Sequence, residues 1–346
     1  MNKRKIIFIF AIIATITLCL VVVGFMFNKT EEEKLNGLTE IFDIAPDGTI
    51  AYVMYDKGRQ KIVIKNDENE ISTLAIHEEK FINDIAFSPD GSTLAYSISP
   101  KDVETELLST INVIDIATLE ETNLFQKAGL ITELAFDPKD GDQLFYIKAD
   151  TFENYSPIAR ANPHDFDLFS YLISEEKHTQ YTNLKKYSMD SLQVSSSDNA
   201  VYIQMVDDET AESAEEVFDA NSRIFKIPLD DPEALSVVSD PNKEIDIYDF
   251  VILSDEEKII YQSVSNPNSG GIFQYELFEY DPNTNEETQL TNLQEYTSRP
   301  LIYDNFIYFI VDTQFAQKYS DYHLYRMDLD GENMTEVELS LDELET

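Results

Sequence analysis

Short apolar runs recur at regular steps along the chain, and each of them ends on a tyrosine. The steps between these tyrosines are 44, 50, 56, 59 and 47 residues. The residues concerned are Tyr52, Tyr96, Tyr146, Tyr202, Tyr261 and Tyr308. A repeat of this length is typical of one four-stranded blade of a β-propeller. An aromatic ring at the same strand position in every repeat is explained by packing between blades.

The second repeat displays the pattern of a blade most completely. Residues 83–87, 93–97, 111–116 and 121–125 are four β-rich runs separated by turn residues. The first turn contains Pro89-Asp90-Gly91, in which proline presets its φ angle and glycine accepts a positive one. We therefore predict an all-β, six-bladed propeller of four-stranded antiparallel blades. The expected blades lie near residues 38–76, 82–126, 131–183, 190–239, 246–292 and 297–340.

The second repeat also resembles a known family. Phe87-Ser88-Pro89-Asp90-Gly91, followed by Leu94-Ala95-Tyr96, is similar to the signature of the TolB-type propeller repeat. The first and third repeats keep parts of it, and the last three keep the tyrosine and the strand order. The resemblance implies a propeller and a role as an extracytoplasmic interaction platform, although related propellers are fused to hydrolases or act as sugar-acid lyases. We expect neither a TolB-type N-terminal domain nor a fused hydrolase, so no particular role carries over.

The first 30 residues have the pattern of an uncleaved signal-anchor. Residues 6–27 form an apolar run of 22 positions, interrupted only by Thr15, Thr17 and Gly24, which is long enough to span a bilayer as a helix. No small-residue cleavage site follows it. Basic residues precede this segment and acidic ones follow it. We predict a cytoplasmic tail at 1–5, a transmembrane anchor at 6–27, a linker at 28–37 and the propeller at 38–346 outside the cell membrane. Cys19 is the only cysteine, so the propeller has no disulfide.

The composition is strongly acidic. The chain has 25 basic and 66 acidic residues and a formal charge of −41. Residues 30–346 alone carry −45, because four of the basic residues and none of the acidic ones lie before them. This charge disfavours nucleic acid and anionic membrane surfaces as partners. The acidic charge is explained either by a soluble surface suited to a salty exterior or by a cationic partner or bound calcium. The acidic segment 207–219 has the same two explanations.

Alignment of the repeats on their tyrosines places one residue of each innermost strand at the mouth of the central channel, where that strand begins. These residues are Ile41, Asp84, Glu133, Ser191, Asp249 and Arg299. We predict that Asp84, Glu133, Asp249 and Arg299 form a polar ligand-binding funnel. Crowded carboxylates would have raised pKa values or would recruit a hard cation such as calcium. The alternative is a water-filled channel with incidental charges.

Long connections between the second and third strands form a second candidate site. They lie near residues 97–109, 148–166, 205–222, 263–274 and 312–321, all on one face, which is the expected binding face. The third contributes Tyr155, Arg160 and His164, a combination suited to a carboxylate or a sugar. His164 beside Asp165 could act as a general base, but adjacent residues of a strand point to opposite faces.

We expect a membrane-anchored, non-catalytic binding or scaffolding module for a protein or cell-wall component. No G-x-S-x-G motif occurs and the four histidines have no metal-ligand spacing. We expect no cofactor, with calcium left open. The alternatives are a glycan-active lyase or hydrolase on the long-loop face and a sensor that regulates a membrane partner.

Overall fold

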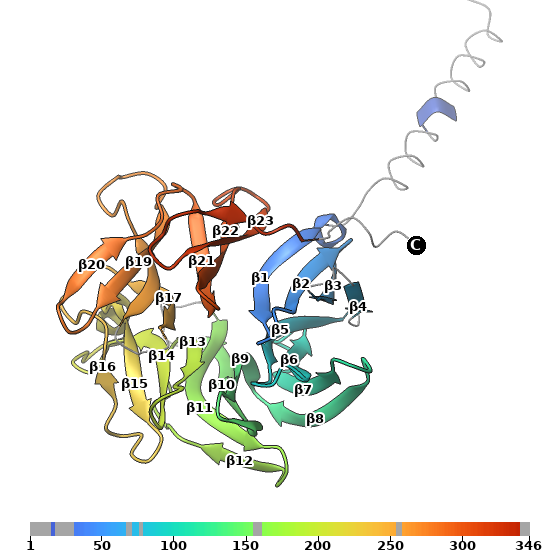
Figure 1. Cartoon of the computed structure of the whole chain (residues 1–346), viewed down its shortest axis with the longest axis horizontal. Helices are drawn as coiled ribbons and strands as arrows, with labels where there is room; N and C mark the ends of the chain where they lie inside the picture. The colour runs from blue at the N-terminus through green and yellow to red at the C-terminus, as the bar shows by residue number, and fades with distance from the viewer. Residues whose placement is uncertain are drawn as a thin grey trace, which may run out of the picture.

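The computed structural model is built almost entirely of β-strands. It describes residues 15–17, 31–66, 71–75, 79–154, 161–253 and 258–339. The strands form successive antiparallel meanders arranged around a centre (Figure 1). The prediction of an all-β, propeller-type fold is confirmed. The only helices among the described residues beyond position 30 are η1 (Glu32–Lys34) and α2 (Ala214–Asp219).

Each meander contains four strands that follow one another in sequence. The first meander consists of β1 (Gly37–Ile44), β2 (Ile50–Asp56), β3 (Arg59–Lys65) and β4 (Ile71–Ala75). The second consists of β5 (Lys80–Phe87), β6 (Thr93–Pro100), β7 (Leu108–Asp115) and β8 (Glu121–Ala128). The third consists of β9 (Leu130–Asp137), β10 (Asp140–Asn154), β11 (Ala161–Leu172) and β12 (Lys177–Gln180). The fourth consists of β13 (Met189–Val194), β14 (Ala200–Val206), β15 (Ser222–Pro228) and β16 (Ser236–Val237). The fifth consists of β17 (Ile247–Ile252), β18 (Ile259–Val264), β19 (Tyr275–Asp281) and β20 (Glu286–Gln289). The last consists of β21 (Tyr296–Tyr303), β22 (Phe306–Asp312), β23 (Tyr322–Asp328) and β24 (Thr335–Glu336).

The hydrophobic core lies between neighbouring meanders rather than within one. Each of the recurring tyrosines is buried at such a boundary or beside it. Tyr146 stacks on Phe169 with ring centroids 5.4 Å apart, and its hydroxyl lies 3.0 Å from Nδ1 of His178. Tyr52 of β2 and Tyr308 of β22 share one cluster, so the last meander packs on the first. This packing supports the interpretation of the tyrosines as structural residues.

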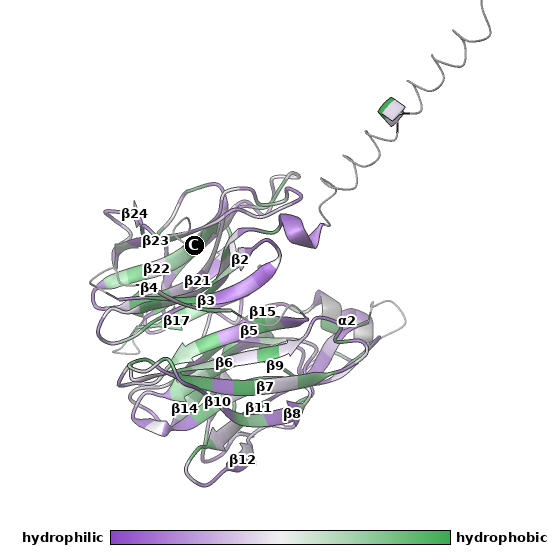
Figure 2. Cartoon of the chain, turned by 90° about the vertical axis from the view of Figure 1, so that its right-hand side faces the viewer, coloured by the Kyte–Doolittle hydropathy of each residue, from purple (hydrophilic) through white to green (hydrophobic). Residues whose placement is uncertain are grey.

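The two sides of the molecule differ in their connections. We call the side that carries the connections between second and third strands the loop side, and the opposite one the turn side. On the loop side, Ser213 caps α2, which forms within the acidic segment (Figure 2). The expected loop over 148–166 is wrong for most of its length, because β10 and β11 continue as a paired ribbon as far as Asn154 and Ala161.

The predicted anchor at 6–27 lies outside the described residues except for positions 15–17, which are helical. Within the described ranges, no helix has the length and apolar character needed to cross a membrane.

Candidate functional site

A β-bulge interrupts the pairing of the first strand with the second in each meander. In β13 and β14, for example, the register shifts between Asp190 and Gln193, so that Ser191 and Leu192 oppose a single residue. A similar shift in β21 contains Arg299 and Pro300. A bulge re-aims the side chains next to it. Ser191 and Arg299 both have a positive φ, of 57° and 51°, a conformation that non-glycine residues rarely adopt.

The predicted residues of the innermost strands lie at these bulges, and the structure brings them together. Asp84, Glu133, Ser191, Asp249 and Arg299 all line one central cavity. Each first strand is the inner edge of its meander, so some of its N–H groups face the channel without a strand partner. Side chains of the preceding meander accept these N–H groups.

The contacts run from one meander to the next around the channel. Asp84 accepts the N–H of Leu134 at 2.8 Å. Glu133 accepts the N–H groups of Ser191 and Leu192 at 2.9 and 2.7 Å. Asp249 accepts the N–H of Arg299 at 2.9 Å. The carboxylates therefore connect neighbouring meanders through charge-assisted hydrogen bonds.

Side chains complete this arrangement at the remaining boundaries. Asp43 accepts the N–H of Phe87 at 2.7 Å, and Gln193 accepts that of Ile252 at 2.7 Å. Ser298 donates to Glu40 at 2.8 Å between the last meander and the first. The guanidinium of Arg299 is the positive group at the centre, with Nη1 3.5 Å from Oε1 of Glu133. Its side chain keeps 32% of its surface exposed, whereas that of Glu133 keeps 7%.

The cavity opens differently from the predicted funnel. The ring residues stand in the middle of their strands and not at the start of them, since Asp84 is the fifth residue of β5 and Glu133 the fourth of β9. The rest of the lining comes from the later parts of the innermost strands and from Pro138 in the following turn. The cavity has a volume of about 300 Å³. It therefore lies on the turn side of the ring, and the expectation of a site at the start of these strands is wrong.

The ring carries more acid than base. Besides Glu133 and Asp249, it includes Asp84 and the neighbouring Asp190. Burial, with the nearby Glu133 carboxylate, raises the pKa of Asp84 to about 8 against the lowering effect of Arg299. Burial, Glu133 and Asp249 raise the pKa of Asp190 to about 7. Burial lowers the pKa of the Arg299 guanidinium, but the carboxylates around it outweigh burial and raise that pKa above its usual range.

Three acidic residues of the ring were not identified from the sequence. Burial raises the pKa of Asp43 to about 6 and also raises that of Glu40. The third residue is Asp190. All three lie in strands in which polar and apolar residues alternate, so their sequence gives no sign of a special role. Ile41, which the alignment placed in the channel, packs instead against the core between the first two meanders. In the bulge of β1, three residues of β1 lie opposite a single residue of β2, so the alignment of the repeats is out of register at this strand.

The second candidate site is only partly described. Tyr155 and Arg160 lie outside the described residues. His164 belongs to β11, its side chain is 9% exposed, and Nδ1 lies 2.8 Å from Oδ1 of Asp165. The sequence argument against this contact is wrong, because Asp165 has a φ of 61° and turns its side chain toward its neighbour. His164 does not line the central cavity.

No group of three or more acidic, histidine or cysteine side chains with the arrangement of a metal site occurs in the described part of the chain. The ring carboxylates Asp84 and Glu133 accept backbone N–H groups at the channel.

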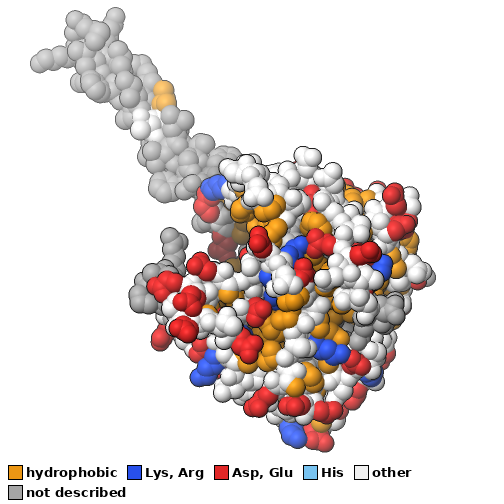
Figure 3. All heavy atoms as spheres, turned by 90° about the vertical axis from the view of Figure 1, so that its left-hand side faces the viewer, with side chains coloured by type: hydrophobic (Ala, Val, Ile, Leu, Met, Phe, Trp, Pro, Cys, Tyr) orange, Lys and Arg blue, Asp and Glu red, His pale blue; other side chains and the backbone are white. Residues whose placement is uncertain are grey.

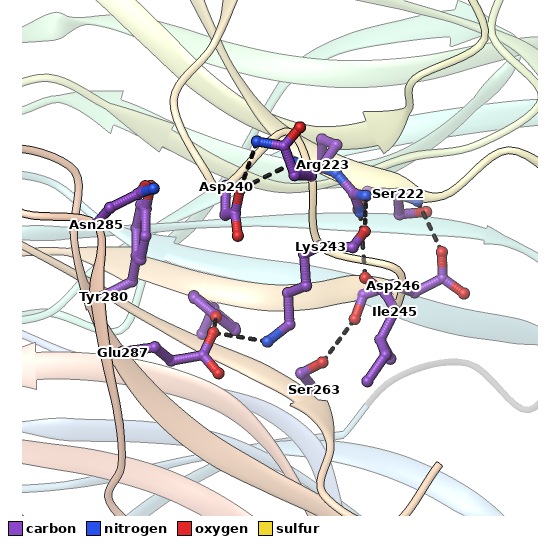
Figure 4. A network of polar contacts seen from close by, with 12 residues as sticks. Ser222, Arg223, Asp240, Lys243, Ile245, Asp246, Ser263, Tyr280, Asn285 and Glu287 are labelled. Carbon is purple, nitrogen blue, oxygen red and sulfur yellow. Dashed lines mark hydrogen bonds and ion pairs between the residues drawn. The ribbon is translucent and has the colours of Figure 1, made fainter. Parts of the chain in front are cut away.

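A further polar network lies between the fourth and fifth meanders (Figure 4). Buried Arg223 of β15 donates to the carbonyl oxygens of Ser222, at 2.8 Å, of Ile245, at 3.1 Å, and of Lys243. Lys243 in turn lies 2.6 Å from Glu287. Arg223 thus holds the connecting segment that leads into β17. A lone arginine in an amphipathic strand gave no signal of this role in the sequence.

Comparisons with known proteins support the fold. No family model and no curated protein matches the chain. Among solved structures, TolB from Acinetobacter baumannii is similar with a TM-score of 0.57 and 16% identity, over 84% of this chain and 63% of TolB. A chain of the nidogen–laminin complex has a TM-score of 0.53 and 12% identity, over 81% of this chain and 89% of that one. An oligogalacturonate lyase from Vibrio parahaemolyticus has a TM-score of 0.54 and 13% identity, over 89% and 79%.

These similarities establish a TolB-like propeller fold. The chain spans just under two thirds of the length of TolB. The similar structures include both binding proteins and enzymes, so the function has to be argued from the site.

Proposed function

We propose that the chain is a membrane-anchored, extracytoplasmic, six-bladed propeller that binds a protein or cell-envelope component without catalysis. The observation that carries this proposal is the acidic ring beneath a cavity of about 300 Å³ on the turn side. Such a cavity accommodates a side chain or a small group of a larger partner. The ring has several carboxylates and one guanidinium, which favours a cationic group, such as a lysine or arginine side chain or an amine.

The surface outside the cavity agrees with this choice. Acidic side chains are spread among fewer basic ones on the side shown in Figure 3. A chain with a formal charge of −41 attracts basic partners and speeds their association, and salt weakens that attraction. The proposed membrane anchor is the apolar segment 6–27, whose length is sufficient to span a bilayer as a helix.

The test compares a blocked cavity with a matched surface change. Ala135 lines the cavity and is half-buried, so Ala135→Phe fills the space beside the ring. Ala161 is exposed at the start of β11, so Ala161→Phe adds the same ring elsewhere. Full-length parent and variants are used to capture components from envelope extracts, with and without calcium and at two salt concentrations.

A component retained by the parent and by Ala161→Phe, lost from folded Ala135→Phe and weakened by salt is the expected result. Equal retention by all three proteins would show that the cavity is not the site. Turnover of a wall polymer by the purified protein would overturn the non-catalytic role.

The glycan-active enzyme is a second candidate because of one observation, the contact between His164 and Asp165. Thr151 also donates to Asp165, at 3.3 Å, so the carboxylate is oriented as a partner of an acid–base histidine would be. This candidate predicts that His164→Ala abolishes depolymerisation of a glycan while circular dichroism stays unchanged. Failure of the parent protein to cleave acidic and neutral wall glycans would exclude it.

A further inference from the structure

The segment before β1 is docked on the loop side of the molecule. η1 sits on the tight β2–β3 turn, where Gly58 donates its N–H to the carbonyl of Leu35 at 3.0 Å. Lys57 donates its N–H to Oδ1 of Asn36 at 2.9 Å. A Cβ at Gly58 would lie 2.6 Å from the carbonyl oxygen of Glu32, and Gly58 has a φ of 82°. Only glycine permits this close approach.

Charged groups from two other meanders hold the same segment. Glu31 accepts from Lys318 and Tyr319 in the β22–β23 connection. Glu32 pairs with Lys101, which directly follows β6. Exposed ion pairs are individually weak. Here, however, they add to backbone hydrogen bonds and reach η1 from both neighbours of the first meander. The helical turn η1 accordingly lies on the same side as α2 in Figure 2.

The short length of chain before η1 limits the distance between the propeller and the proposed membrane anchor. Only residues 28–30 separate the apolar segment 6–27 from Glu31. Fully extended, the step from residue 27 to residue 31 covers at most about 14 Å, at roughly 3.5 Å per residue. The chain therefore leaves the bilayer close to the loop side.

We propose that the docked segment is a clamp that holds the loop side of the propeller against the bilayer surface, with the central cavity facing away from the membrane. This inference rests on the anchor in the proposed function. It differs from the sequence-based expectation that the face of the long connections binds the partner. The occupant of the loop side is the membrane itself, and the partner reaches the cavity from outside.

The chemistry of the loop side fits a lipid surface next to the clamp. Residues 266–274 in the β18–β19 connection carry no charge, in a chain in which 26% of residues are charged. Within it, Ile272 and Phe273 are 63% and 46% exposed. Beneath it, Tyr275 packs on Tyr248 and Tyr296 with ring centroids 5.7 and 5.0 Å apart. Aromatic and aliphatic side chains of this kind suit the boundary between headgroups and acyl chains.

Electrostatics limits this contact to the uncharged part of the loop side. The acidic surface of the protein is repelled by anionic headgroups. The β22–β23 connection is an exception, because residues 313–320 include Lys318 and no acidic residue. The contact therefore involves the last two meanders, adjacent to the clamp, and the acidic segment around α2 stays in water.

The experiment measures the distance of each side from the lipid in the full-length protein. In a Cys19→Ser background, Asn268→Cys labels the β18–β19 connection and Ser196→Cys labels the β13–β14 turn, and both positions are exposed. Each labelled protein is reconstituted into phosphatidylcholine vesicles that contain a headgroup-linked quencher. We expect several-fold stronger quenching at position 268 than at position 196.

Two pairs of variants test the cause. Lys101→Glu with Lys318→Glu opens the clamp and should reduce the difference between the two labels, whereas Lys258→Glu breaks a surface pair with Glu279 and should not. Ile272→Ser with Phe273→Ser should weaken quenching at position 268. Leu119→Ser, at an exposed residue of the β7–β8 turn, should leave it unchanged.

Equal quenching at the two positions, or stronger quenching at position 196, would overturn the orientation while leaving the anchor and the cavity proposals standing. Protein that does not float with the vesicles would disprove the anchor and the orientation together. Neither result would affect the capture experiment on the cavity, so the two proposals fail separately.

Discussion

The carboxylate of Glu133 in β9 accepts the backbone N–H of Ser191 in β13 at 2.9 Å, across the boundary between two meanders. Its second oxygen accepts the next N–H along, that of Leu192. Ser191 is held in a left-handed backbone conformation with its own hydroxyl 3.1 Å from Asp249. A single buried side chain thus satisfies two amides that the bulge leaves without a strand partner. The predicted ligand-binding residue also has a structural role.

Glu133→Ala should therefore strongly destabilise the propeller. The substitution leaves the N–H groups of Ser191 and Leu192 without this acceptor and removes the carboxylate that pairs with the Arg299 guanidinium. Breaking a buried charged contact in this way costs about 3–5 kcal/mol. Glu133→Gln retains one acceptor and should cost less. Urea unfolding monitored by tyrosine fluorescence measures both, with Glu120→Ala at an exposed turn as the control. Equal midpoints for Glu133→Ala and Glu120→Ala would contradict the role.

The raised pKa values of Asp84 and Asp190 predict that stability falls as the pH rises. In the unfolded chain these groups titrate near 3.8, whereas in the folded protein their pKa values are about 8 and about 7. Between these limits the folded state binds more protons than the unfolded state, so the free energy of unfolding decreases with pH up to about pH 8. The protein should be more stable to urea at pH 5.5 than at pH 8, other groups being equal.

The double variant Asp84→Asn, Asp190→Asn removes the two ring carboxyl groups with the highest pKa values, whereas Asp43, with a pKa of about 6, still titrates. It should flatten the dependence between pH 5.5 and pH 8, because neither amide titrates. A slope as steep as that of the parent protein would show that it originates in groups other than Asp84 and Asp190. The matched control is Asp115→Asn with Asp281→Asn, since hydrogen bonds from Thr118 and Asn283 lower the pKa values of these groups outside the ring.

The tyrosine repeat explains how far the ring could be predicted. Because each tyrosine has a fixed place in the second strand, counting back from it located Asp84, Glu133, Ser191, Asp249 and Arg299 correctly as residues that meet. The count was wrong in β1, where the bulge between Leu38 and Phe42 is longer than in the other meanders. Bulge length depends on hydrogen bonds to the neighbouring meander, which the local sequence does not encode.

Contacts between distant segments could not be predicted at all. The pairing of Thr151 with His164 extends a ribbon through residues whose composition suggested a loop. Arg223 and the carbonyl oxygen of Lys243 are 20 residues apart and meet only because the connecting segment folds back between two meanders. The place of η1 likewise depends on the short turn at Gly58, and the sequence identified Gly58 only as one glycine among 10.

Tyr146 offers a test of the packing role of the repeated tyrosines. Its ring is fully buried, and its hydroxyl contacts His178. Tyr146→Ala should lower the free energy of unfolding by about 3–5 kcal/mol through the cavity that it leaves. Tyr146→Phe keeps the ring and loses one hydrogen bond, worth about 1 kcal/mol. Thermal unfolding distinguishes the two. Similar losses for both variants would show that the hydroxyl, and not the ring, is what the position needs.

Arg223→Lys tests whether a planar, forked donor is needed between the fourth and fifth meanders. The guanidinium reaches three backbone carbonyl groups from a buried position, and an ammonium on a shorter stem cannot reproduce that geometry. The loss of hydrogen bonds from a charged donor should cost about 2–3 kcal/mol. Arg326→Lys provides the control, because Arg326 is exposed and lies over the ring of Phe306 at 4.9 Å. Urea unfolding of both variants gives the comparison. If they unfold at the same urea concentration, the connecting segment is held by packing of Lys243 on Tyr261 and Phe278, and Arg223 contributes only its charge.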